Sequence, residues 1–448
     1  GAAAQGGTTP VHTIDQSIRF NADDSAYLSR TQPTSTTTNK LFTISFWIKR
    51  TPGNNDIVYN GAYNSNNFNW LGFASDDTFF VQFYSGGNNI FVQTTDRKFR
   101  DPSAWYHIVY IYDSAKDISS ERTRFYVNGQ RETLVQYSSI TLYPSQNGSH
   151  YWIYTGVGNY IGLRPSDNYR LDSYIAELAM FQDQGYEPEN FGEYNSSNIW
   201  IPKNGIADLN FGDSGFYIKG EDSSNLGNDS GTANSGSGYD FTASGLTADD
   251  QKSDSPTSNH TTWNPLTTSA QTYSNGNLNA ASSSSAWKGG FTTAQVPLNS
   301  GTWYYEIYVD SAGASSGQFS IGWSESNRSV SDDNSSGDTE GWVTYAINGS
   351  YYANGGSGSL GDTYTTGDVI GCKIDTDSST NNVEFYKNGA SQGTRSQAFN
   401  TGGTGFISPY ILLYGTRNAT ARFAQSEWTQ TPSGITDANA INTKNLGS

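Results

Sequence analysis

Four loop regions of the sequence, 62–70, 163–170, 323–328 and 348–354, combine aromatic rings with amide or guanidinium groups, the residue types that recognise sugars. Sugars present apolar C–H faces together with hydroxyl groups, so their sites pair an exposed ring with polar side chains or backbone groups. We therefore predict carbohydrate binding. In the alternative interpretation these rings are core residues or cross-strand pairs. The nine candidate residues are Tyr63, Asn67 and Trp70, then Arg164, Asn168 and Tyr169, then Trp323, Arg328 and Tyr352.

Catalytic chemistry has less support in the sequence. Glycoside hydrolysis needs two carboxyl groups converging on one bond, but no Glu-x-Asp-x-x-Glu pattern is present, and Glu187 and Glu189 flank Pro188 instead of alternating along a strand. His107 falls within a strand-like run and is expected to be a hydrogen-bonded sheet residue. Cys372 alternates with isoleucines and is expected to be a small buried side chain. We predict that the protein is not an enzyme.

Acidic doublets in the expected loops indicate a candidate calcium site. Asp23 and Asp24 are the doublet that we assign to it. Calcium takes several oxygen ligands from carboxylates and carbonyls. The alternative is that such residues form Asx-turns at the surface. Calcium is the single cofactor considered, because the four histidines are scattered and none has a Cys or His at metal-ligand spacing.

Composition excludes several classes of partner. The 448 residues carry 42 acidic and 25 basic side chains, a net charge of −17, which would repel nucleic acid. No run approaches the roughly 20 apolar residues of a membrane span, and the first residues lack the pattern of a signal peptide. The single cysteine excludes an intrachain disulfide.

Alternating apolar residues and Asn-Gly pairs predict an all-β protein. Residues 42–49 and 105–112 alternate with period two, and the second run is apolar on both faces, which is typical of a central strand. Asn128-Gly129 and Asn388-Gly389 each follow a short β run, as in tight hairpins. Many short strands of this kind predict antiparallel β-sandwiches or barrels.

The polar stretch 214–285 predicts a boundary between two domains. We expect a first sandwich at 13–250 and a second at 251–428, with a tail at 1–12 and a linker or tail at 429–448. The apolar patches within 215–241 are expected to add a further strand pair to the first sandwich.

Two family resemblances agree with this division. The ordered segments 17–28, 42–49, 105–129 and 160–181 resemble a laminin-G-like, concanavalin A-type jelly roll. In the second half, residues 303–307, 319–323 and 341–345 resemble a SPRY domain. So does the run Gly-Asp-Val-Ile-Gly-Cys at 367–372 followed by Phe-Tyr-Lys-Asn-Gly at 385–389. The resemblances imply two antiparallel sandwiches in tandem, a concanavalin A-like jelly roll and then a SPRY-like sandwich.

The tandem of these two modules is similar to tail-fibre-like virion proteins of marine tailed bacteriophages. That resemblance implies a non-enzymatic tail fibre or capsid appendage that binds host surface glycans and other virion proteins, as a homo-oligomer without membrane insertion. A chain without disulfides or a signal peptide suits assembly in a reducing host cytoplasm, and hence a virion location. The alternatives are a secreted bacterial adhesin or carbohydrate-binding module, and a purely structural capsid decoration or connector subunit.

Overall fold

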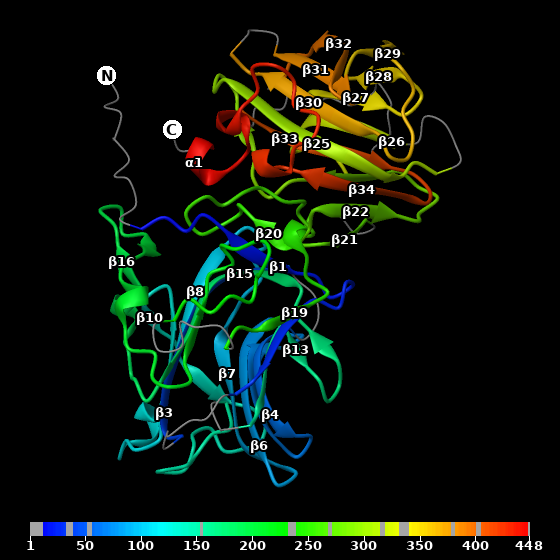
Figure 1. Cartoon of the computed structure of the whole chain (residues 1–448). Helices are drawn as coiled ribbons and strands as arrows, with labels where there is room; N and C mark the ends of the chain where they lie inside the picture. The colour runs from blue at the N-terminus through cyan, green and yellow to red at the C-terminus, as the bar shows by residue number, and fades with distance from the viewer. Residues whose placement is uncertain are drawn as a thin grey trace. The chain divides into compact units, whose positions relative to one another are not determined.

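The computed structural model divides the chain into two compact units, Gly1–Thr257 and Ser258–Ser448 (Figure 1). Both are built from antiparallel strands, which confirms the all-β prediction. The predicted N-terminal tail lies outside the described residues except for its last residue, His12. The structure describes residues 12–32, 39–51, 56–152, 156–231, 239–267, 271–313, 319–330, 340–377, 381–399 and 405–446.

Two large sheets form the first unit in the described residues. Sheet 1 contains, in spatial order, β10 (Gln130–Arg131), β9 (Thr123–Val127), β8 (Trp105–Asp113), β3 (Leu41–Arg50), β15 (Ser173–Gln182), β1 (Ser17–Phe20) and β20 (Gln251–Lys252), with β18 (Phe216–Ile218) also paired to β15. Sheet 2 contains β11 (Leu134–Gln136), β7 (Asn88–Lys98), β6 (Thr78–Ser85), β5 (Asn67–Phe73), β4 (Asp56–Asn64), β12 (Gly158–Ile161), β2 (Tyr27–Thr31) and β19 (Thr242–Ser244). Two short hairpins complete it, β13 (Leu163–Arg164) with β14 (Tyr169–Arg170), and β16 (Gly192–Tyr194) with β17 (Trp200–Pro202).

The period-two alternation places one set of apolar residues from each sheet in a shared core. Phe46 of β3 and Phe73 of β5 are fully buried there, together with Trp152. β8 is buried on both faces, since Tyr110 belongs to this core and Val109 to a second cluster on the other side of sheet 1. This confirms the prediction that residues 105–112 form a central strand.

The polar stretch divides between the two units, and its residues 214–257, which we call the connector, belong to the first sandwich. β18 pairs with β15 of sheet 1 and β19 pairs with β2 of sheet 2, so the two strands extend different sheets and do not pair with each other. Within 215–241 the structure has β18 and an isolated antiparallel bridge between Ile218 and Asp229, and β19 begins directly after this segment at Thr242. β20 pairs with β1, which is why the division falls after Thr257 rather than at residue 250.

The second unit is also a two-sheet sandwich in the described residues. Sheet 3 contains β21 (Thr272–Ser274), β22 (Asn279–Ser282), β34 (Arg417–Arg422), β25 (Thr302–Ser311), β30 (Val369–Asp375), β31 (Asn382–Lys387) and β32 (Ala390–Ser396). Sheet 4 contains β23 (Lys288–Phe291), β33 (Phe406–Leu413), β26 (Phe319–Glu325), β27 (Trp342–Ala346), β28 (Ser350–Ala353) and β29 (Gly356–Ser359), with β24 (Val296–Pro297) beside β33.

The Asn-Gly hairpins form as the sequence predicts. Asn128 and Gly129 have φ values of 48° and 76° between β9 and β10, and Asn388 and Gly389 have 49° and 82° between β31 and β32. Both residues of a type I′ turn need positive φ, which asparagine and glycine adopt at the least steric cost.

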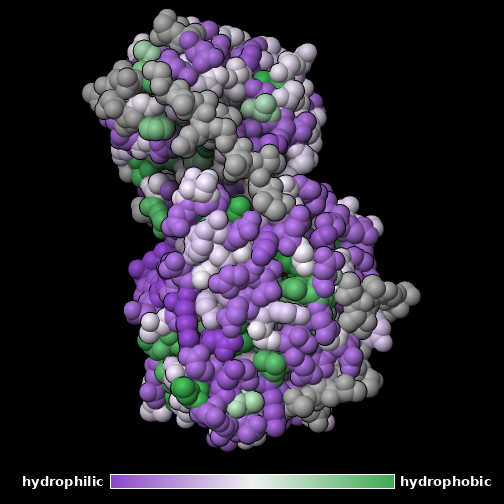
Figure 2. Space-filling model, turned by 90° about the vertical axis from the view of Figure 1, so that its left-hand side faces the viewer, coloured by the Kyte–Doolittle hydropathy of each residue, from purple (hydrophilic) through white to green (hydrophobic). Residues whose placement is uncertain are grey.

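The segment predicted as a C-terminal tail folds onto the second unit. Ile441 is fully buried in the core of that unit, and Trp428 and Ala440 pack with Tyr304. The short helix α1 (Thr443–Leu446) follows. Among the described residues, no helix has the length and apolar character required to cross a membrane. Figure 2 shows one face of the molecule, on which hydrophilic residues predominate and hydrophobic ones form small separate patches.

Candidate functional site

The guanidinium of Arg164 brings together residues from two of the four predicted loop regions. Its Cζ atom lies 4.9 Å from the ring centroid of Trp70 on β5 and 4.9 Å from that of Tyr169 on β14. Asp167 accepts hydrogen bonds from both Nε and Nη2 of Arg164, and these two bonds fix the orientation of the guanidinium. Candidates that lie about 100 residues apart in sequence thus form one cluster.

Strand pairing produces this cluster. β13 and β14 form a hairpin in which Arg164 is paired with Tyr169. On β5, Leu71 enters the inter-sheet core, so Trp70 points to the opposite, outer face of sheet 2. There Trp70 stacks on Phe80 of β6 with 4.7 Å between centroids, and Tyr137 meets Phe80 edge-on at 5.2 Å. We call this line of five side chains the aromatic row: Tyr137, Phe80, Trp70, Arg164 and Tyr169.

The two ends of the aromatic row are exposed and its middle is covered. Tyr137 is 49% and Tyr169 is 39% exposed, whereas Trp70 is 5% exposed. Trp70 therefore contacts Arg164 from the buried side of the guanidinium. The prediction that the Trp70 ring contacts a sugar is wrong, because the ring is covered. The accessible ring is that of Tyr169.

Asn168 lies at the tip of the same hairpin with a left-handed φ of 59° and an exposed side chain. Its Oδ1 accepts a hydrogen bond from Nη2 of Arg170 at 2.8 Å. This contact orients the amide, and its Nδ2 donates to no described residue. A ring and a free amide donor are therefore adjacent at this end of the row.

The other two candidates of the first unit lie outside the row. Asn67 has a structural role, because its Oδ1 accepts from Ser85 Oγ at 3.1 Å, Gly86 N at 3.0 Å and Tyr151 Oη at 3.2 Å. Tyr63 is 61% exposed at the end of β4 and is not one of the rings that Arg164 contacts.

The candidates of the second unit do not form a site. Trp323 is fully buried on β26 and meets Tyr305 of the opposite sheet at 5.2 Å, while Arg328 is 2% exposed and lies 4.0 Å from the Trp342 ring. The prediction that Trp323 and Arg328 face a sugar is wrong, because both side chains are almost fully covered by the rest of the domain. Tyr352 is half-buried, and its hydroxyl accepts from Asn348 Nδ2 at 3.3 Å.

The acidic candidates make local contacts. Glu187 accepts from Arg124 Nη2 at 2.8 Å and from Tyr126 Oη at 2.7 Å, one partner on each carboxylate oxygen. Asp23 and Asp24 lie in an exposed turn in which Asn21 Nδ2 donates to Asp24 at 2.6 Å. No group of three or more His, Cys, Asp or Glu side chains within the described ranges is arranged to hold a metal ion. Calcium binding at this doublet stays a prediction.

His107 and Cys372 are structural, as the sequence indicates. Trp200 Nε1 donates to His107 Nδ1 at 3.0 Å, so the ring hydrogen is on Nε2 and is donated to Ser45 Oγ at 2.9 Å. Burial lowers the pKa of His107 to about 3. Cys372 is fully buried and burial raises the pKa of its thiol, which makes it unreactive.

Two buried histidines predict acid sensitivity of the first unit. Burial lowers the pKa of His150, as of His107, to about 3, against 6.5 in the unfolded chain. The unfolded state takes up the proton first, so each histidine should cost about 2 kcal/mol of stability between pH 7 and pH 5. The His150 ring packs on Phe42 and Tyr112, and its two ring nitrogens have no hydrogen-bond partner in the described residues. As the pH falls from 7 to 5, the unfolding free energy of His150→Phe should therefore rise by about 2 kcal/mol relative to that of wild type, as measured by urea unfolding. If the difference between variant and wild type is the same at both pH values, the prediction is wrong.

Comparisons with known proteins agree with the two units. A sequence model described as the concanavalin A-like lectin/glucanases superfamily, of the laminin G type, matches residues 21–184, and the SPRY domain model matches residues 302–426. The chain contains a laminin G-like, concanavalin A-like domain followed by a SPRY domain. The aromatic row, whose residues lie between Trp70 and Tyr169 in the sequence, is within the first match. A search of curated proteins finds no match.

Solved structures similar to this chain include both kinds of domain. The SPRY domain of human HERC1 is 20% identical, with a TM-score of 0.30, 36% of this chain and 96% of that chain covered. Domains LG4-5 of the mouse laminin alpha1 chain are 11% identical, with a TM-score of 0.31 and coverage of 98% and 89%. A heptameric SAP-like pentraxin from Limulus polyphemus is 14% identical, with a TM-score of 0.29 and coverage of 43% and 93%.

Proposed function

We propose that this protein is a non-enzymatic surface protein of a tailed-phage virion, a tail fibre or capsid appendage, that binds host glycans through the Tyr169 end of the aromatic row. One observation carries the glycan part. Arg164 lies 4.9 Å from both Trp70 and Tyr169 and so supports an exposed ring, and the residue before that ring, Asn168, has an exposed side chain whose Nδ2 is available to donate. The pairing of ring and amide is the combination that sugar recognition requires.

Each residue of this site has a distinct role in the proposal. The C–H face of a sugar packs on the Tyr169 ring, and Asn168 Nδ2 donates to a ring hydroxyl. Arg164 acts as a positioning residue, because it makes cation–π contacts with both Trp70 and Tyr169. The contact with Trp70 is the stronger of the two, because that ring is shielded from water. Because Asp167 neutralises the guanidinium, the site favours neutral sugars over anionic ones.

Removing the ring should weaken glycan binding about 10-fold, since exposed aromatic and cation–π contacts each contribute about 1 kcal/mol. We expect this for Tyr169→Ala, and a similar loss for Arg164→Ala because the ring loses its support. A glycan array that includes host lipopolysaccharide identifies the ligand, and calorimetry then compares the variants. Tyr352→Ala in the SPRY domain is the matched control and should bind as wild type. Absence of binding to the whole array, with calcium present, would refute the proposal.

Three features support the non-enzymatic virion role. Both oxygens of Glu187 are held by Arg124 and Tyr126, so this carboxylate is occupied by a structural ion pair. Neither domain depends on a disulfide, since the single cysteine is buried, and this suits assembly in a reducing cytoplasm. The strong negative charge keeps particles apart in solution and away from nucleic acid.

Mass spectrometry tests the virion role directly. The peptides of this chain should be found in purified phage particles, bound to other virion proteins, and native mass measurement should give a homo-oligomer. Presence of the protein in bacterial culture medium without particles would favour an adhesin or carbohydrate-binding module instead. A lattice-bound subunit without glycan affinity would favour a structural decoration protein.

A further inference from the structure

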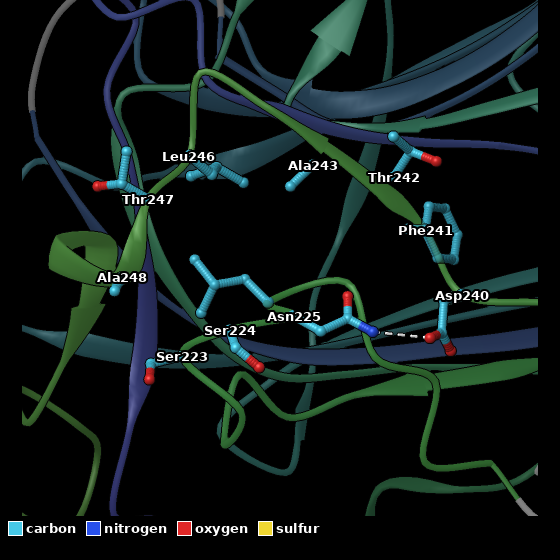
Figure 3. Close-up of a pocket in the computed structure, with 11 residues that line it drawn as sticks. Ser223, Ser224, Asn225, Asp240, Phe241, Thr242, Ala243, Leu246, Thr247 and Ala248 are labelled. Carbon is cyan, nitrogen blue, oxygen red and sulfur yellow. Dashed lines mark hydrogen bonds between the residues drawn. The ribbon is translucent and has the colours of Figure 1, made fainter. Parts of the chain in front are cut away.

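A cavity of about 420 Å³ opens beside β19 in the first unit (Figure 3). One wall is formed by residues 223–226 and the other by residues 240–248. Both walls lie outside the two family matches, at 21–184 and 302–426. The connector segment of this chain thus builds a cavity that neither family model covers.

The lining of the cavity combines apolar side chains with hydroxyl and amide groups. Ala243 and Leu246 point inward from one wall in Figure 3, and Leu226 lines the other. The hydroxyl-bearing residues of the lining are Ser223, Ser224, Thr242 and Thr247. An amphipathic surface of this kind matches a ligand with both C–H groups and hydroxyls.

One amide in the wall is held in a defined orientation. Asn225 Nδ2 donates to Asp240 Oδ2 at 2.7 Å, and Asp240 Oδ1 accepts from Asp229 N at 3.0 Å. Because its Nδ2 is engaged with Asp240, the Oδ1 of Asn225 is left to accept, and Figure 3 shows it directed toward the cavity. The amide therefore offers a preoriented acceptor for a hydroxyl donor.

Both walls are tied to the sandwich. Phe241 N donates to Gly227 O at 2.9 Å, which joins the two walls directly. Thr247 forms a capping box with Asp250, whose Oδ1 accepts from Arg19 at 2.8 Å. The cavity thus belongs to the folded domain.

The charge of the lining selects among ligands. None of the eleven lining residues is Lys or Arg, and the one ionisable side chain among them is Asp240. A sulfate, phosphate or uronate would meet no compensating cation here. The lining therefore favours a neutral ligand.

We propose that this cavity is a second binding site, which takes one unit of a neutral, hydroxylated saccharide. The ring's C–H face packs on Ala243, Leu246 and Leu226, and a hydroxyl donates to Asn225 Oδ1. The volume lies within the usual range of small-ligand sites. With no exposed aromatic ring in the lining, we expect affinity in the millimolar range. This site does not depend on the aromatic row.

Methyl NMR of the full chain with leucine labelling tests the site. Methyl glycosides of glucose, galactose, mannose and N-acetylglucosamine are the neutral probes, and glucuronate is the anionic one. At least one neutral glycoside should shift the Leu226 and Leu246 methyl signals in a saturable way, and glucuronate should shift them less. No saturable shift with any of the four, or a larger shift with glucuronate, would overturn the proposal.

Variants separate this site from the aromatic row. Ala243→Phe fills the cavity from an exposed strand position where phenylalanine is well tolerated, so it should abolish the shifts while the remaining leucine signals stay in place. Asn225→Ala should weaken binding several-fold, and Tyr169→Ala should leave the shifts unchanged. Shifts that persist in Ala243→Phe, or vanish in Tyr169→Ala, would overturn the proposal. Loss of array binding in Tyr169→Ala with these shifts intact would separate the two sites.

Discussion

Replacing Trp323 with alanine is expected to destabilise the SPRY domain by about 3–5 kcal/mol, the cost of removing a large aromatic side chain from a packed core. Trp323 is fully buried on β26, between strands β27 and β33, and its ring meets Tyr305 of the opposite sheet. Packed cores relax only partly around a deleted side chain, so we expect a cavity to remain.

Urea unfolding of the full chain measures this effect. The SPRY transition should move to lower urea, while the transition of the concanavalin A-like domain and its glycan binding stay unchanged. Tyr352→Ala is the matched control, because its half-buried ring lies on β28 near the edge of the same sheet, and it should cost about 1 kcal/mol or less. A Trp323→Ala variant with near wild-type stability and weakened glycan binding would restore Trp323 as a site residue.

The architecture was predictable because local patterns carry it. Alternation in 42–49 and 105–112 matches β3 and β8, and the Asn-Gly pairs occupy the hairpin turns that they predict. These signals depend on residues within one strand or one turn. They need no knowledge of which strands become neighbours.

Only part of the candidate binding site could be predicted from the sequence. Which residues become neighbours across a sheet depends on how the strands pair, and no single strand contains that information. Tyr169 and Trp323 are both aromatic residues near polar loops, yet one is exposed and the other is in the core. The alternation of Phe319, Ile321 and Trp323 along one strand was a local sign of burial. No local sign links Trp70 to Phe80 or Tyr137, since their contact requires the pairing of β5 with β6 and the path of the chain after β11.

What holds the connector to the first sandwich could not be predicted from local patterns for the same reason. Its Gly, Ser and Asn content is typical of a linker, but Arg30 of β2 holds three of its residues from 184 to 209 positions away. Arg30 donates to Asp229 Oδ2 at 3.1 Å, to Tyr239 O at 3.0 Å and to Ser214 O at 2.9 Å. A single charged side chain on β2 thus organises the segment that lines the cavity.

Arg30→Met is accordingly expected to destabilise the concanavalin A-like domain by about 3–5 kcal/mol. The guanidinium lies 4.5 Å from the Phe241 ring and is almost fully buried, and so is its partner Asp229. Removing one member of a buried ion pair leaves the other charge without compensation, which costs more than the pair itself contributes. Because methionine fills much of the volume of the arginine side chain, the loss of stability in this variant measures mainly the missing charge and hydrogen bonds.

A double-mutant cycle separates pairing from packing. Asp229→Asn alone should also destabilise, since it leaves the Arg30 charge buried, whereas the double variant should lose about 1–3 kcal/mol less than the sum of the single changes. Additive losses would show that Arg30 acts through its contacts with Phe241 and the two carbonyl groups. In either single variant the Leu226 and Leu246 methyl signals should move even without ligand, because the wall that carries Leu226 lies within the segment that Arg30 holds. Glycan binding at Tyr169, on a separate hairpin, should remain as long as the domain is folded.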